Sequence, residues 1–304
     1  MSPIIGVLKG GMSSERAVSL KSGEAVAAAL RSRGHTVVEI DVGPDLPQQL
    51  IAGGIDVAWI ALHGAFGEDG CVQGLLEIMR IPYTGSSMAA SAVAMDKIRT
   101  KRMLQDVAVM HLPGDRVWRT GDGIDDDLTW PVVAKTPNGG STIGVYICKD
   151  AGELERALVK CTEWGEEVLL EDRIVGEEIT VAVLDGTPLT PVAIRPADGF
   201  FDFEAKYTKG QTEYIVPAPI ADAVTTSASA QAVAAYRTLA LSGIARADFI
   251  VDADGIPWFL EINTIPGMTA TSLSPMAAGA TGISFEELVE RLMKSARLHL
   301  QPSV

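Results

Sequence analysis

Residues 246–268 constrain the chain more than any other stretch, because two apolar-alternating runs flank an Asp254-Gly255 pair. Asp-Gly between such runs is typical of a β-hairpin with a two-residue turn. That turn would place Asp248 directly opposite Glu261, and side chains alternate between the two faces of a strand. The polar face would then carry Arg246, Asp248, Glu261 and Asn263, and the core-facing side would carry Phe249, Val251, Leu260 and Ile262.

Two carboxylates that oppose each other on a bare sheet repel, since their Cβ atoms lie about 5 Å apart. A hard cation between Asp248 and Glu261 reverses the sign of this interaction, and a set of oxygen ligands completed by the Asn263 amide suits Mg²⁺. The pattern therefore predicts a magnesium site, with a solvated polar face on an edge hairpin as the alternative. One residue more or fewer in the turn would break the pairing, so the register is itself a prediction.

Composition limits the size and the partners of the protein. The chain has 304 residues, 47% of them hydrophobic and 21% charged, which is ordinary globular composition and indicates about two domains, or three small ones. A net charge of -14 argues against nucleic acid or an anionic membrane as a partner, because both need basic surface. A phosphate ligand would therefore need locally placed lysine, arginine, metal or backbone N–H groups.

The spacing of the cysteines and the lack of a long apolar run indicate the cellular compartment. Cys71, Cys148 and Cys161 are widely spaced and form no Cys-x-x-Cys pair, so we expect reduced, buried thiols. The sequence has no apolar run of 18 residues and no basic N-terminal segment followed by an apolar core and a cleavage site. We expect a soluble, cytoplasmic protein.

The N-terminal part alternates strands and helices, which predicts a parallel α/β unit. An apolar strand over 4–8 leads through Gly10-Gly11 into a long helix, and further strands are expected over 36–41 and 57–62. Ligands of such sheets bind beyond the carboxyl ends of the strands, where Glu15 and His63 would lie. Read alone, Glu15 is equally well a first-turn carboxylate favoured by the helix dipole, and His63 a satisfied loop histidine.

A second pattern begins near residue 95. A helix is expected from Asp96, and a buried strand over 130–135 is followed by the glycine-rich loop 137–144 and by a strand over 145–148. Such a hairpin flap can lay backbone N–H groups over phosphates. Lys97 and Lys135 are then candidate phosphate ligands, although each alone reads as an ordinary surface lysine.

The last third of the chain contains the hairpin predicted within residues 246–268 and a long segment without a periodic pattern. Strands are expected over 166–171, 179–184 and 189–195, with Asp185-Gly186 as a tight turn. Residues 196–219 then read as one irregular loop, and a loop of this length in a compact domain is usually functional, such as an active-site lid. Helices are expected over 223–241 and 285–298.

Several long motifs, in this order, resemble the D-alanine–D-alanine ligase family of the ATP-grasp superfamily over essentially the whole chain. The motifs are Gly-Gly-Met-Ser-Ser-Glu-Arg (10–16), His-Gly-Ala-Phe-Gly-Glu-Asp-Gly (63–70), Pro-Tyr-Thr-Gly-Ser (82–86), Glu-Ala-Lys-Tyr (204–207) and Glu-Ile-Asn-Thr-Ile-Pro-Gly-Met-Thr (261–269). The resemblance implies an ATP-grasp fold preceded by an N-terminal Rossmann-like parallel α/β domain. The implied units are residues 1–94, a flap subdomain 95–177, and a catalytic subdomain 178–304 with its lid at 196–219.

The resemblance also implies the ligands of each site. ATP would lie between the flap sheet and the hairpin sheet. Its phosphates would be held by Lys97, Lys135, Ser141 and Lys206, its adenine by the backbone from Glu171 to Ile174, and its ribose by Glu178. Two Mg²⁺ ions, for which Mn²⁺ could substitute, would bind Asp248, Glu261 and Asn263, with Glu261 bridging.

For the amino-acid substrates, the resemblance implies a site on either side of the hairpin. Glu15, near His63, would grip the ammonium of the first D-alanine, and Ser272 with the backbone beside Leu273 would receive the carboxylate of the second. Arg246 and the N–H of Gly267 would stabilise the oxyanion of peptide-bond formation. Glu15, Ser141 and Tyr207 would form a hydrogen-bonded set that joins the N-terminal domain, flap and lid on closure.

The implied activity is ATP-dependent ligation of two D-alanines, through a D-alanyl phosphate, for peptidoglycan precursors, and the implied assembly is a homodimer. Two alternatives stay open: the same mechanism with D-serine or D-lactate as acceptor, and a non-catalytic protein that senses ATP. The chain departs from the family pattern at Thr136, Thr142, Phe203 and Ala17, none of which removes a predicted ligand. Tyr207 favours an amine acceptor.

Overall fold

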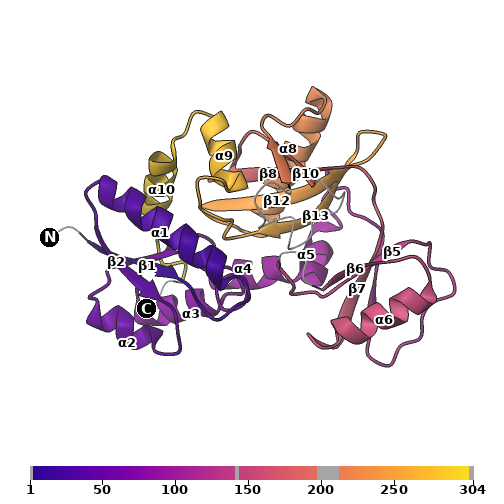
Figure 1. Ribbon diagram of the computed structural model, residues 1–304, viewed down its shortest axis with the longest axis horizontal. Helices are drawn as coiled ribbons and strands as arrows, with labels where there is room; N and C mark the ends of the chain where they lie inside the picture. Colours follow the sequence, from indigo (N-terminus) through magenta and orange to yellow (C-terminus); the bar gives the residue numbers. More distant parts are fainter. Residues whose placement is uncertain (1–2, 141–143, 197–211, 301–304) are drawn as a thin grey trace.

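The computed structural model of the protein describes residues 3–140, 144–196 and 212–300. These residues form three sheets, which Figure 1 shows as an N-terminal unit at left, a large sheet at upper right and a small sheet at lower right. Within the described ranges no helix is both long and apolar enough to cross a membrane.

The N-terminal unit is a parallel three-stranded sheet in the order β2-β1-β3. Its strands are β1 (Ile4–Lys9), β2 (Thr36–Asp41) and β3 (Val57–Ile60), and its helices are α1 (Arg16–Ser32), α2 (Leu46–Ala52), α3 (Cys71–Met79) and α4 (Met88–Met95). Helix α1 buries a stripe at helical spacing: Ser19, Ser22, Val26 and Leu30. Because the strands are parallel, their carboxyl ends meet at one edge, and the predicted α/β unit is confirmed.

The large sheet is antiparallel and has six strands, in the order β11-β10-β8-β12-β13 with β9 beside β8. Its strands are β8 (Glu177–Leu184), β9 (Thr187–Pro188), β10 (Val192–Pro196), β11 (Thr212–Ile215), β12 (Ile244–Val251) and β13 (Pro257–Asn263). Figure 1 shows α8 (Asp222–Thr238) and α9 (Leu273–Ala280) on the same side of this sheet. Ala247 and Phe249 pack in the core that α8 covers, so the alternate residues of β12 are turned to the other face.

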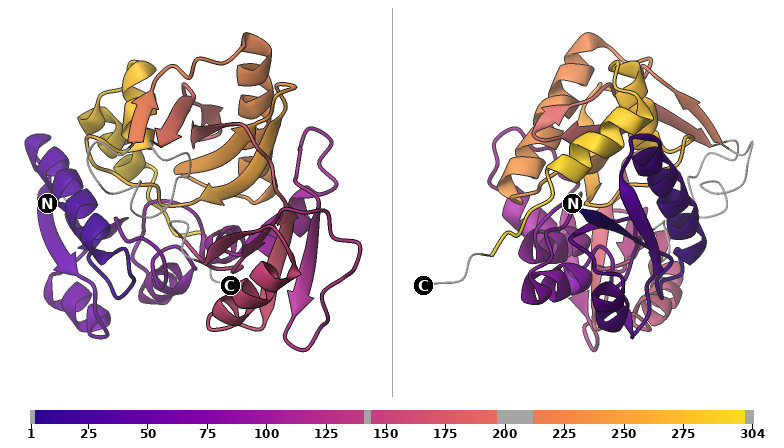
Figure 2. Two further views of the ribbon diagram at one scale, coloured as in Figure 1. Left: turned by 45° about the vertical axis from the view of Figure 1, so that its right-hand side comes forward. Right: turned by 90° about the vertical axis from the view of Figure 1, so that its left-hand side faces the viewer.

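The small sheet has the order β4-β7-β5-β6, and all its pairs are antiparallel. Its strands are β4 (Asp115–Arg119), β5 (Val132–Lys135), β6 (Val145–Cys148) and β7 (Glu167–Asp172), and the nearby helices are α5 (Lys97–Leu104) and α6 (Ala151–Cys161). Leu154 and Leu158 of α6 pack on Val132 and Val168 in a core of their own. Figure 2 shows this unit beside the large sheet, at the opposite end of the molecule from the N-terminal unit.

The C-terminal helices connect the N-terminal unit to the large sheet. Val26 and Leu30 of α1 lie in one core with Leu288 and Leu292 of α10 (Phe285–Lys294) and with Leu184 of β8. This shared core holds the carboxyl edge of the parallel sheet against the loop that follows β13. The site described below forms along that contact.

The hairpin formed by β12 and β13 has the predicted pairing at the end that carries the four polar side chains. Arg246 pairs with Asn263 and Asp248 with Glu261, as predicted. The register then shifts by one residue at a β-bulge, so Phe249 pairs with Phe259 and the strands end at Val251 and Pro257. The predicted two-residue turn is therefore wrong, because the connection runs from 252 to 256.

The bulge also corrects one predicted core residue. Phe259 is buried against Phe249, with ring centroids 5.7 Å apart, and takes the place expected for Leu260. Leu260 lines a cavity on the ligand face beside Glu261. An inserted residue changes which face every following side chain occupies, and alternation alone does not reveal it.

Other expectations need smaller corrections. Residues 212–215 of the predicted irregular segment 196–219 form β11, which pairs with β10. Cys71 is exposed, whereas Cys148 and Cys161 are buried as expected. The pattern also missed α2, α9 and β4. Asp185-Gly186 is a tight turn, with positive φ at both residues, as predicted for a hairpin of this type.

Candidate active site

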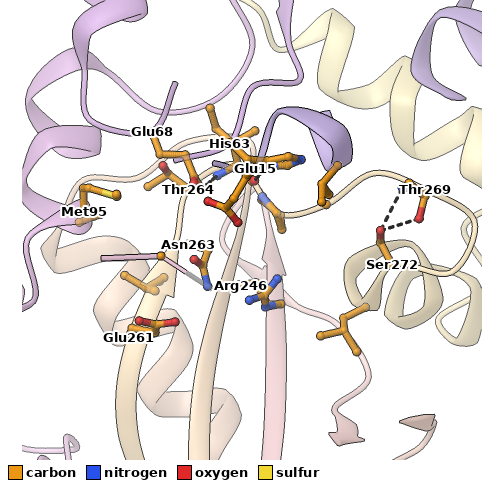
Figure 3. A pocket seen from close by; sticks show the side chains of 18 of the residues that line it. Glu15, His63, Glu68, Met95, Arg246, Glu261, Asn263, Thr264, Thr269 and Ser272 are labelled. Carbon is orange, nitrogen blue, oxygen red and sulfur yellow. Dashed lines mark hydrogen bonds between the residues drawn. The ribbon is translucent and has the colours of Figure 1, made fainter. Parts of the chain in front are cut away.

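Two cavities lie against the ligand face of the large sheet. The first, of about 440 Å³, is enclosed by the N-terminal unit, the hairpin and the loop after β13. Figure 3 shows Glu15 and His63 reaching into it from one side and Arg246, Asn263 and Ser272 from the other. Gly267 and Leu273 also line it, so every predicted substrate-binding residue meets in this cavity.

The second cavity, of about 670 Å³, lies between the small sheet and the large sheet. Of the predicted nucleotide and metal residues, it is lined by Lys97, Lys135, Glu171, Ile174, Glu178, Asp248 and Glu261. Lys97, Gly139 and Glu261 line both cavities, so the two meet at these residues. The predicted residues Ser141, Lys206 and Tyr207 lie outside the described residues.

The two carboxylates predicted to bind metal, Asp248 and Glu261, are paired with basic side chains of the protein. Asp248 is buried and accepts two hydrogen bonds of 2.9 Å from Arg246, one of 2.6 Å from the Thr180 hydroxyl and one of 3.2 Å from the Asn263 amide. Glu261 lies 3.0 Å from the Lys97 ammonium. Each carboxylate is thus neutralised by a basic side chain.

These residues are suited to a hard divalent cation. Asp248 and Glu261 are direct cross-strand partners, and Asn263 adds an amide two residues along the same strand. Carboxylate and amide oxygens are the ligands that Mg²⁺ prefers. The described ranges contain no cluster of three or more His, Cys, Asp or Glu side chains arranged to hold a metal.

Glu15 lies where the N-terminal unit meets the glycine-rich loop of the small sheet. It is buried at the start of α1 and makes no capping bond from its side chain. A Cβ atom built on Gly64 would lie 2.9 Å from its Oε2, and one built on Gly140 would lie 3.0 Å away. A side chain at either position would crowd the Glu15 carboxylate, and Gly64 also has a positive φ of 67° that favours glycine.

His63 is fixed by a chain of hydrogen bonds across three segments. Its Nδ1 lies 3.0 Å from the carbonyl oxygen of Ile265, which can only accept, so Nδ1 carries the proton. Its Nε2 then accepts from the Ser22 hydroxyl at 3.2 Å, and the Ser22 oxygen accepts from the N–H of Met268 at 3.2 Å. Burial lowers the pKa of the ring, which is consistent with a neutral imidazole. His63 and Ser22 together fasten the loop after β13 to the N-terminal unit.

Glu68 fastens the same loop from the other side, and sequence reasoning missed it. Its carboxyl group accepts from the N–H of Gly64 at 2.8 Å and from the N–H of Ile265 at 3.3 Å. Burial, together with the negative charge of Glu15, raises the pKa of Glu68 to about 8. The only signal in the sequence was its place within the 63–70 motif.

The raised pKa of Glu68 predicts a pH-dependent stability. The folded protein keeps the Glu68 proton up to about pH 8, whereas the unfolded chain loses it near the ordinary value of 4.5. Rising pH therefore favours the unfolded chain in this window. Between pH 6.5 and 8, where a His63 with a lowered pKa stays neutral, we expect the wild type to lose about 1–2 kcal/mol of unfolding free energy relative to Glu68→Gln.

Urea unfolding at four pH values in this range measures the difference. Glu287→Gln, which alters an exposed carboxylate on α10, is the matched control and should run parallel to the wild type. If Glu68→Gln also ran parallel to the wild type, Glu68 would be ionised in the folded protein.

The loop after β13 ends at the N-terminus of α9. Ser272 is the N-cap of this helix, and its hydroxyl accepts from the N–H of Thr269 at 3.0 Å and lies 2.8 Å from the Thr269 hydroxyl (Figure 3). A Cβ on Gly267 would lie 2.9 Å from the Ser272 hydroxyl oxygen. The helix N-terminus beside Leu273 and the neighbouring hydroxyl groups form a place suited to a carboxylate.

Comparisons with known proteins agree with this arrangement. The family profile described as "D-ala D-ala ligase C-terminus" matches residues 115–294, and "D-ala D-ala ligase N-terminus" matches residues 45–86. The D-alanine–D-alanine ligase of Syntrophotalea carbinolica is 49% identical over 295 residues, covering 97% of this chain and 96% of the relative. That of Geobacter sulfurreducens is 47% identical, covering 98% and 95%.

Solved structures give the same result. The D-alanine–D-alanine ligase from Bacillus anthracis superposes with a TM-score of 0.87 at 38% identity and covers 97% of both chains. The structure of the Bacillus anthracis enzyme complexed with ATP superposes with a TM-score of 0.85 at 36% identity.

The three sheets, with lysines facing a cavity between two of them, define an ATP-grasp enzyme behind a Rossmann-like N-terminal unit, as the sequence predicted. The extent of the sequence matches narrows this class further. The chain belongs to the D-alanine–D-alanine ligase family.

Proposed function

We propose that the protein joins two molecules of D-alanine to D-alanyl-D-alanine, with conversion of ATP to ADP and phosphate, for peptidoglycan precursors. The observation that carries this proposal is the meeting of the two cavities at Lys97 and Glu261. A nucleotide in the larger cavity can there direct its terminal phosphate at an amino acid in the smaller one. Membership of the family supports the same conclusion.

The first step activates the carboxylate of the first D-alanine. A carboxylate is a poor acyl donor because oxide cannot leave, so one of its oxygens attacks the γ-phosphorus and ADP departs. Charge spread over the phosphoryl oxygens must be neutralised, and Lys97 and Lys135 line the cavity in which it develops. The product is D-alanyl phosphate, in which phosphate is the leaving group.

Metal ions complete the phosphate site in this proposal. Asp248, Glu261 and Asn263 would hold two Mg²⁺, or Mn²⁺ in their place, and the ions would neutralise the triphosphate. Arg246 and Lys97, which pair with the two carboxylates, would then share them with the ions. Arg246 already lines the smaller cavity.

The second step forms the peptide bond. The amine of the second D-alanine attacks the acyl carbon, the C–N bond forms, the bond to phosphate breaks, and the proton that the amine loses leaves with the phosphate. The tetrahedral intermediate carries an oxyanion, for which we propose Arg246 and the N–H of Gly267 as donors. The second carboxylate would bind at Ser272 and beside Leu273, where a helix N-terminus is suited to it.

Glu15 would receive the ammonium of the first D-alanine, since its buried carboxylate faces the smaller cavity. The backbone from Glu171 to Ile174 would hold the adenine and Glu178 the ribose. Ser141, Lys206 and Tyr207 keep their predicted roles in closing the site. The units 1–94, 95–177 and 178–304, the homodimer and the cytoplasmic location likewise remain predictions.

A coupled assay of ADP release tests the proposed activity. We expect release that depends on D-alanine and on a divalent cation, and its absence would contradict the proposal. A panel of D-alanine, D-serine and D-lactate as acceptors separates a D-alanine–D-alanine ligase from a ligase that uses D-serine or D-lactate as its acceptor. D-alanine should have the highest specificity constant near neutral pH.

A further inference from the structure

Lys101 is a lysine that the proposed mechanism does not use, although its side chain is almost completely buried, with 1% exposed. It lies on α5 four residues after Lys97, so the two lysines share one face of the helix. Fully buried lysines are rare unless they are paired with an acidic group. Burial of this side chain therefore points to a specific partner.

The partner of Lys101 is Glu171. The Lys101 ammonium donates to Oε1 of Glu171 at 2.5 Å and to the carbonyl oxygen of Pro113 at 2.9 Å. Asp115 is also near, at 3.6 Å, but its two carboxylate oxygens accept from Arg102 at 3.2 and 2.7 Å. The charge of Lys101 is thus committed mainly to Glu171.

Glu171 holds a second lysine with its other oxygen. Its Oε2 contacts the ammonium of Lys135, and its side chain is 2% exposed. Burial would raise the pKa of Glu171, but the charges of Lys135 and Lys101 hold it below the usual value. The carboxylate is therefore ionised between two cations, and the three groups together carry one net positive charge.

The three charges are not equally placed toward the nucleotide cavity. Lys135 and Glu171 line the cavity of about 670 Å³, whereas Lys101 lies behind Glu171 and does not line it. We propose that Lys101 is a positioning residue for nucleotide binding: it neutralises Glu171 from the protein side and so leaves the charge of Lys135 for the phosphates. This inference rests on the proposed use of ATP.

Removing the charge of Lys101 should weaken binding of phosphates specifically. In Lys101→Met, Glu171 would have Lys135 as its remaining cation, and a buried carboxylate holds a single partner firmly. The cluster of Lys101, Lys135 and Glu171 would then lose its one net positive charge. We expect the Kd of ATP to rise about tenfold or more, with little change in the Kd of adenosine, because ATP is strongly anionic and adenosine carries no charge.

Equilibrium binding of ATP and of adenosine to the full chain, without D-alanine, tests this inference. Arg99→Met is the matched control, since it removes an exposed cation of the same helix that pairs with Asp96, and it should bind ATP as the wild type does. Lys101→Gln removes the charge but keeps a donor for the carbonyl oxygen of Pro113, so it should show the same loss of affinity for ATP.

Two results would overturn the inference: a wild-type Kd for ATP in Lys101→Met, or an equal loss for ATP and adenosine, which would indicate a merely structural role. If Lys101→Met does not fold, Lys101→Gln decides, because a wild-type Kd for ATP in that variant also contradicts the proposal. Failure of the wild type to bind ATP would instead contradict the proposed function and not the pairing of Lys101.

Discussion

Replacing Glu261 with glutamine is expected to reduce kcat by about 10³-fold or more while leaving the fold intact. Glu261 lies where both cavities meet, directly opposite Asp248, and its proposed role is to bridge two cations. Glutamine has nearly the same shape but no negative charge, so it cannot neutralise two divalent ions. The fold should survive because the Glu261 side chain is partly exposed and faces the two cavities rather than the hydrophobic core.

Rates of D-alanine-dependent ADP release, with thermal melts of both proteins, measure this effect. Glu287→Gln is the control: it removes the same charge from an exposed pair on α10, which is worth only a few tenths of a kcal/mol, and should keep full activity. Activity of Glu261→Gln that no longer depends on a metal ion would refute the bridging role.

Replacing Arg246 with methionine is expected to slow dipeptide formation by about 10²–10³-fold, the usual cost of an oxyanion donor. In the structure Arg246 lines the smaller cavity while it binds Asp248 through two hydrogen bonds. Because its proposed role belongs to the second step, the first step should survive. The variant should still form D-alanyl phosphate, which hydroxylamine traps as a hydroxamate.

Dipeptide and hydroxamate are measured side by side, with Mg²⁺ present so that Asp248 does not remain without a cation. Arg291→Met, which breaks the exposed pair with Glu287, is the matched control and should change neither product. Equal loss of both products in Arg246→Met would place Arg246 in the phosphoryl-transfer step and contradict the division of roles.

The hairpin shows how far sequence reasoning reached. Pairing of Asp248 with Glu261 follows from apolar alternation on both sides of a turn signal, and the structure confirms it. The bulge does not follow, because an inserted residue leaves the local pattern readable in two ways. Packing of Phe259 on Phe249 fixes the choice, together with the register of β12 on β8. Part of the cause of the bulge, the pairing of β12 with β8, therefore lies outside the hairpin.

The same limit applies to the buried polar groups. His63 and Lys97 were predicted from the sequence as site residues, whereas Glu68 was marked only by its place in the 63–70 motif and Lys101 by no signal at all. What distinguishes Glu68 and Lys101 is burial, and burial depends on segments far away in the chain. Glu171, the partner of Lys101, lies 70 residues further along.

The sequence by itself determined most of the strands and helices, the types of residue in the site and the family, because these depend on local periodicity and on contiguous motifs. The tertiary structure decided which charge meets which. Lys97 is paired with Glu261, Lys101 and Lys135 share Glu171, and His63 is held as a neutral ring. Charge pairing depends on distances of a few ångströms and on exclusion of water, and only the packed chain sets both.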